Sequence, residues 1–105
     1  MSSDLASLGR FTDVSLLVLL SLSTGPKHGY AMIEDIVQFS GTALEPGTLY
    51  GALMRLEGKG WIEALPAVDR RRPYRLTTAG ARFLRQQLAT LQHLVSVGAR
   101  RLAPA

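Results

Sequence analysis

The sequence lacks cysteine, so neither a disulfide framework nor a thiolate metal site can form. It also lacks a hydrophobic run of membrane-spanning length, because the apolar segment Val14–Leu22 is about half as long as a bilayer requires. No basic region precedes that segment and no convincing cleavage site follows it, which argues against a signal peptide. Low-complexity tracts and repeats of useful period are absent as well. These absences predict a soluble, cytoplasmic protein that does not enter a membrane.

Acidic residues are missing beyond Asp69, whereas basic residues continue. The arginines that follow are Arg70, Arg71, Arg72, Arg75, Arg82, Arg85, Arg100 and Arg101. The whole chain carries a formal net charge of +4. This excess is compatible with a polyanionic partner, although a merely solvated basic surface is the alternative interpretation. The run of three adjacent arginines favours the polyanion.

Groups suited to catalysis are sparse. His28 and His93 lie far apart in the sequence, in different predicted elements. Glu34 and Asp35 are neighbours on a predicted helix, so they do not share a face as a catalytic carboxylate pair would. There is no glycine-rich phosphate loop, metal-ligand cluster or nucleophile elbow. We therefore expect no enzyme, no cofactor and no metal site.

The apolar residues that are present predict one folded domain and a buried first helix. The hydrophobic fraction is 47% over 105 residues, a size that would gain from dimerisation. Thr12 or Asp13 can cap the first helix. Phe11 can pack onto Leu16 one turn into it. The segment is apolar nearly all round, which predicts burial on most sides, and Gly25–Pro26 ends it.

Two more helices are predicted before the basic region. Residues 29–39 show helical spacing, and the apolar residues on the predicted face are Tyr30, Ile33, Ile36 and Val37. A third helix is expected to begin near Glu45–Pro46, because proline suits the first turn. It is expected to end by Lys59–Gly60, because glycine stops a helix.

The sequence from Trp61 onward predicts a β-hairpin followed by a long last helix. Trp61–Val68 has the pattern of a strand, although Pro66 indicates an edge or an early end. Pro73–Leu76 is a short return strand, and the turn between them contains neither glycine nor asparagine. Thr77 or Thr78 can cap a helix that reaches about Leu102. The order of elements predicts a mostly α fold with a two-stranded β wing. A flexible lead-in (1–10) would precede a winged helix-turn-helix (11–76), and a dimerisation helix (77–105) would follow.

The third predicted helix has one apolar face and one face with little bulk. Leu49, Ala52, Leu53 and Leu56 share the arc expected to face the core, and the opposite arc holds Gly47, Gly51, Met54 and Gly58. One interpretation is that the glycines allow close approach to a groove wall or a phosphate. The alternative is that Gly47 and Gly58 lie at the helix ends, where glycine costs little, so that only Gly51 needs an explanation. The predicted DNA-binding residues are Thr48, Tyr50, Gly51, Met54, Arg55, Arg70, Arg71 and Arg72. Partial burial of Tyr50 and pairing of Arg55 with Glu57 are the alternatives.

The last helix carries a heptad seam. Its members are Ala81, Leu84, Leu88, Leu91, Val95, Gly98 and Leu102, at alternating spacings of three and four. The predicted dimer interface consists of Leu84, Leu88, Leu91, Val95 and Leu102. Phe83 and Leu94 lie off the seam and are expected to pack back on the domain. Alternatively, the whole stripe folds against its own core. Between two such helices, an apolar slot lined by Leu84, Leu88 and Leu91 could admit a flat aromatic compound; alternatively, it is closed core.

Three segments resemble the PadR family of transcriptional regulators. They are HGY at 28–30, PGTLYGALMRLEGKGWIE at 46–63 and RPYRLTTAG at 72–80. The resemblance implies a homodimeric winged helix-turn-helix that represses by binding a palindromic operator and is released by a signal or small ligand. Gly51 departs from the family, which commonly has proline there, and the wing is short. A winged-helix module that docks on protein rather than DNA is the alternative function.

Overall fold

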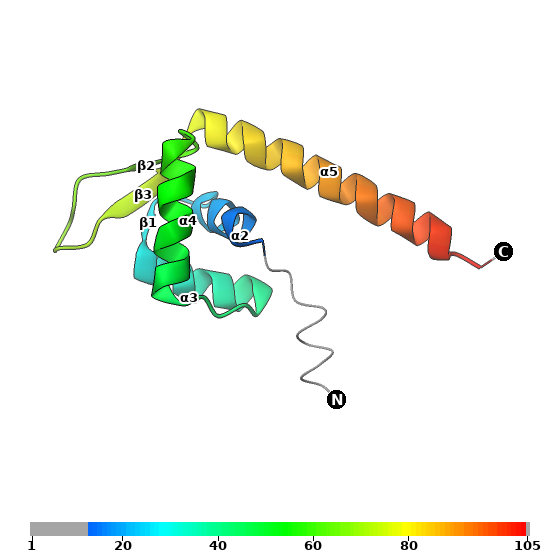
Figure 1. Cartoon of the computed structure of the whole chain (residues 1–105), viewed down its shortest axis with the longest axis horizontal. Coiled ribbons are helices and arrows are strands. Elements are labelled where there is room, and N and C mark those ends of the chain that lie inside the picture. Colours follow the sequence, from blue (N-terminus) through cyan, green and yellow to red (C-terminus); the bar gives the residue numbers. More distant parts are fainter. Residues whose placement is uncertain (1–12, 105) are drawn as a thin grey trace.

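The computed structural model describes residues 13–104. Its elements, in chain order, are α2 (Val14–Leu22), β1 (Lys27–His28), α3 (Gly29–Ser40), α4 (Pro46–Gly58), β2 (Ile62–Ala64), β3 (Pro73–Leu76) and α5 (Thr78–Leu102). Helices α2, α3 and α4 pack together with the strands at one side, and α5 extends away as a long arm (Figure 1). This arrangement confirms the predicted mostly α, winged helix-turn-helix fold. The predicted lead-in (1–10), the Thr12 cap and the Phe11 staple lie outside the described residues.

Helix α2 is the centre of the core, as its apolar sequence predicts. Asp13 caps it, since the carboxylate accepts a hydrogen bond from the Leu16 backbone N–H at 3.0 Å. Val18 and Leu19 are fully buried. The helix contacts α3, α4, α5 and β3, so almost every direction around its axis is covered. Such all-round burial explains why the segment shows no polar face.

Helix α3 buries only part of the predicted face, since Ile36 is buried and Ile33 is half-buried against the core. Gly29, Met32 and Ile36 are buried, whereas Tyr30 is 64% exposed and Val37 is 41% exposed. The prediction was wrong for these two side chains because apolar residues occupy more than one side of this helix. Packing selects the side that carries Gly29, where the absence of a Cβ lets α3 approach α4 closely.

Helix α4 has the predicted bounds and core face. The buried residues Leu49, Ala52, Leu53 and Leu56 are each at most 1% exposed. Pro46 occupies the first turn, and Gly60 takes a left-handed φ of 75° just beyond the end. The helix therefore starts and stops where the sequence signals place it.

The sheet has three strands: the two predicted wing strands, β2 and β3, and a third strand, β1, that was not predicted. Strand β3 pairs antiparallel with β2 on one side and with β1 on the other. Strand β1 is only two residues long, too short for any alternating pattern to reveal it. Strand β2 ends at Ala64, well before the predicted Val68, because Pro66 lacks the N–H that would continue the ladder.

Helix α5 begins against the domain and then leaves it. Thr77 caps it by accepting from the Gly80 backbone N–H at 3.0 Å. Phe83 stacks on Trp61 with ring centroids 3.7 Å apart, which confirms that it packs back on the domain. Leu94 is 57% exposed, so its expected packing on the domain is wrong. The helix has run beyond the bundle by that point, as Figure 1 shows. No helix among residues 13–104 is long and apolar enough to cross a membrane.

Candidate nucleic-acid interface

The outer face of α4 is open to solvent. Thr48 and Arg55 are exposed, Tyr50 is half exposed and Met54 is 75% exposed. A Cβ atom added at Gly47 or Gly58 would meet no atom within 4 Å. Nothing within the chain therefore requires these glycines, and the face presents few bulky side chains to any groove it enters.

The wing turn is a tight two-residue hairpin. Val68 and Arg71 exchange two backbone hydrogen bonds, of 2.7 and 2.9 Å. The residues between them, Asp69 and Arg70, both have positive φ, at 50° and 66°. Turns of this kind match the right-handed twist of the flanking strands and usually contain glycine or asparagine. The turn projects the predicted wing arginines Arg70, Arg71 and Arg72 into solvent.

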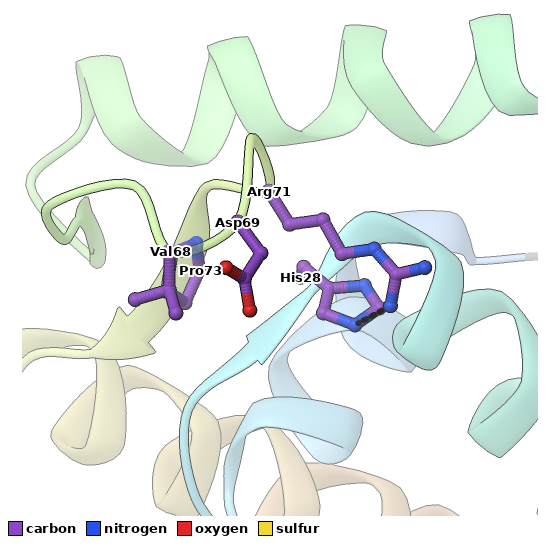
Figure 2. Close-up of a pocket in the computed structure, with 5 residues that line it drawn as sticks. All are labelled: His28, Val68, Asp69, Arg71 and Pro73. Atoms are coloured by element: carbon purple, nitrogen blue, oxygen red, sulfur yellow. Dashed lines mark hydrogen bonds between the residues drawn. The ribbon is translucent and has the colours of Figure 1, made fainter.

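Two of the three wing arginines turn back toward the domain. The Arg72 guanidinium donates a hydrogen bond to the Leu65 carbonyl at 3.2 Å. Arg71 reaches the first strand, where its Nη1 lies 3.4 Å from His28 Nε2. Figure 2 shows the Arg71 side chain extending from the turn to the His28 ring, with Asp69 lining the same hollow. The Arg71 side chain thus lies beside the residue that precedes α3.

A cleft joins α4 to the wing. Its volume is about 270 Å³, and its lining residues are His28, Gly29, Tyr30, Tyr50, Arg70, Arg71, Arg72 and Tyr74. The structure therefore brings predicted Tyr50 beside the three predicted wing arginines. Predicted Thr48, Gly51, Met54 and Arg55 lie on α4 outside this cleft.

His28, Tyr30 and Tyr74 also line the cleft, although they were not among the predicted DNA-binding residues. Burial raises the pKa of the Tyr74 phenol, and the negative charge of Glu57 adds to that shift, while Arg72 opposes it. His28 caps α3, because its Nδ1 accepts from the Ala31 N–H at 3.3 Å. The HGY segment at 28–30 was part of the family resemblance. Its proximity to the wing could not be predicted, because it depends on the pairing of β1 with β3.

A second cleft lies beside α5. It encloses about 260 Å³ and is lined by Leu20, Ser23, Leu76, Ala81, Leu84, Arg85 and Leu88. Leu84 and Leu88 of the predicted slot between two α5 helices line this cleft within one chain, and Leu91 does not. Of the predicted dimer residues, Leu84 is buried in the domain's own core, and Leu88, Val95 and Leu102 are exposed. Leu91 is half-buried against the core, and Val95 and Leu102 lie on the part of the arm beyond the domain (Figure 1).

Comparison with known proteins identifies the family. The family described as the transcriptional regulator PadR-like family matches residues 17–86. The chain belongs to the PadR-like family of transcriptional regulators. Its matched region contains most of α2, all of α3 and α4, the wing and the start of α5. Family members regulate transcription rather than catalyse a reaction, in agreement with the prediction that this chain is not an enzyme.

Solved structures of PadR-type regulators share the fold. A PadR family regulator from Eggerthella lenta is 30% identical, with a TM-score of 0.74, covering 99% of this chain and 93% of that one. A PadR family regulator from Clostridium difficile is 25% identical, with a TM-score of 0.77, covering 86% and 98% respectively. These likenesses extend over nearly the whole of each regulator.

One relative is much longer than this chain. An uncharacterised 37.1 kDa protein in transposon TN4556 from Streptomyces fradiae is 45% identical over 85 residues. The match covers 81% of this chain and 25% of that protein. The PadR-like unit therefore also occurs as about a quarter of a larger polypeptide.

Proposed function

We propose that this PadR-like regulator binds double-stranded DNA as a homodimer and represses transcription from a palindromic operator. Helix α4 would enter the major groove with Thr48, Tyr50, Gly51, Met54 and Arg55 toward the DNA. The Arg70, Arg71 and Arg72 wing would contact the phosphate backbone. The observation that supports this most is the cleft in which Tyr50 of α4 meets the wing arginines, because it aligns a groove-reading element with a phosphate-binding one.

Dimerisation through α5 is part of the proposal. Leu88, Val95 and Leu102 are on the heptad seam and are 41%, 71% and 87% exposed in the single chain. A second copy of the same helix would cover these side chains, as in a coiled coil. Two α4 helices related by a twofold axis would then read half-sites about 34 Å apart.

Release by a small aromatic ligand is the regulatory part of the proposal. The cleft beside α5 combines Leu84 and Leu88 with the exposed Arg85. A ligand of roughly drug-like size needs about 300 Å³ or more, so a cleft of about 260 Å³ would have to be enlarged by the second copy. Ligand binding there would shift α5, and a shift of α5 would change the distance between the two α4 helices of the dimer.

Selection of bound duplexes from a random-sequence library at fixed salt tests the operator proposal. We expect an enriched motif with two inverted halves spaced by about one helical turn. Recovery of duplexes without any shared motif would instead favour the protein-docking module. Arg70→Ala, Arg71→Ala and Arg72→Ala combined should weaken retention on selected and random duplexes alike, because phosphate contacts carry no sequence information.

A further inference from the structure

The residues that line the cleft between α4 and the wing include three arginines and no carboxylate. Tyr30, Tyr50 and Tyr74 also line it, and phenol hydroxyls and guanidinium groups are both hydrogen-bond donors. Asp69 is the nearest carboxylate along the turn, yet neither ion pair among residues 13–104, Lys27–Asp35 or Arg75–Glu63, includes it. A site lined in this way favours an anion.

The position of the proton on the His28 ring also favours an anion. Because Nδ1 accepts from the Ala31 N–H, the neutral ring carries its proton on Nε2. Nε2 is then a donor, and it lies 3.4 Å from Arg71 Nη1, which is also a donor (Figure 2). Arginine has no acceptor, so the two groups cannot satisfy one another directly. An oxygen of a bound anion can accept from both.

The backbone at Gly29 brings the Tyr50 hydroxyl to the same place. A Cβ atom added at Gly29 would lie 2.8 Å from the Tyr50 hydroxyl oxygen, so the phenol crosses directly over this glycine. Gly29 follows His28 in the chain. The Tyr50 hydroxyl, the His28 ring and the Arg71 guanidinium therefore come from α4, β1 and the wing but line one cleft.

We propose that His28, Tyr50 and Arg71 together bind a single phosphate of the DNA backbone. This inference rests on the proposed DNA-binding function and adds His28 as a phosphate contact. The phosphate would sit between α4 and the wing and fix the position of one relative to the other. The phenol and imidazole would supply directional hydrogen bonds, and the guanidinium would supply charge.

A double-mutant cycle on a random-sequence duplex tests whether one phosphate is shared. Tyr50→Phe removes only the hydroxyl, and Arg71→Gln removes only the charge. We expect each to weaken binding at least about ten-fold, and Arg71→Gln to reduce the salt slope by about 1 per site. If both contact one phosphate, the double variant should fall well short of the product of the two losses, since neighbours that share a partner are not additive.

Two further variants serve as controls. His28→Ser keeps a capping oxygen for α3 but removes Nε2, so we expect weaker binding with an unchanged melting temperature. Arg101→Gln removes one charge at the far end of α5 and should bind like the original chain. A loss in the double variant equal to the product of the two single losses would overturn the shared phosphate site. Full binding by His28→Ser would overturn it as well. An original chain whose duplex binding ignores salt would instead overturn the proposed function.

Discussion

Gly80→Ala should be among the most damaging small substitutions in this protein. A Cβ atom at this position would lie 1.9 Å from the Trp61 carbonyl oxygen, whereas contacts under 3.0 Å essentially never occur. It would also lie 2.9 Å from Leu76 Cδ1. The obstacle is backbone rather than a flexible side chain, so the start of α5 must move by about 1 Å.

The cost follows from the contacts that hold this junction. The Trp61 carbonyl accepts from the Thr77 N–H at 3.0 Å, and the Thr77 hydroxyl donates to the Gly60 carbonyl at 2.7 Å. Overpacking costs about 1–3 kcal/mol and weakening these two hydrogen bonds costs about 1 kcal/mol each. Alanine recovers about 1 kcal/mol of helix propensity. The net loss in the free energy of unfolding is therefore about 2–4 kcal/mol.

Urea unfolding at a fixed protein concentration measures this loss. The fluorescence of Trp61, the one tryptophan, reports on the junction because its ring stacks on Phe83. Gly58→Ala is the matched control, since a Cβ there meets nothing within 4 Å. We expect it to be neutral or to stabilise by up to about 1 kcal/mol. Equal stability of the Gly80→Ala and Gly58→Ala variants would refute the close approach at Trp61.

Three other predictions follow from the wing, the sheet and the arm. Arg70→Gly should raise the free energy of unfolding in urea by about 1 kcal/mol, because Asp-Gly suits a turn with two positive φ values. Because its folded pKa is raised, Tyr74 stabilises the fold below pH 10.0 and loses that contribution as pH rises through the higher folded value. Tyr74→Phe should therefore flatten the alkaline fall in stability. Val95→Glu should yield monomers by light scattering, whereas Gln86→Glu, on the opposite face of α5, should not.

The sequence predicted best those elements that have both a period and clear ends. Helix α4 shows an apolar arc between Pro46 and Gly60, and its bounds agree with the structure. Strand β1 was not predicted, because two residues are too few to show an alternating pattern. Its pairing with β3 depends on the tertiary fold rather than on the local sequence. The buried face of α3 was predicted only in part, because its apolar residues do not lie on one side of the helix. Packing against α4 determines which of them are buried.

The candidate site was predicted in part for the same reason. Tyr50 and the wing arginines could be recognised from the segment that contains them. Their proximity to His28 and Tyr30 could not be predicted, because it requires β3 to place the wing beside β1. The positive φ of Arg70 could not be predicted either, since the second position of such a turn usually holds glycine.

The salt dependence of duplex binding tests the central claim most directly. If the dimer neutralises about six phosphates through its two wings and α4 helices, affinity should fall on the order of 10³-fold between about 50 and 200 mM salt. Fluorescence anisotropy with a labelled duplex measures that slope. A steep, linear fall in the logarithm of the affinity is the predicted result. A nearly flat curve over this range would contradict phosphate-driven DNA binding by this protein.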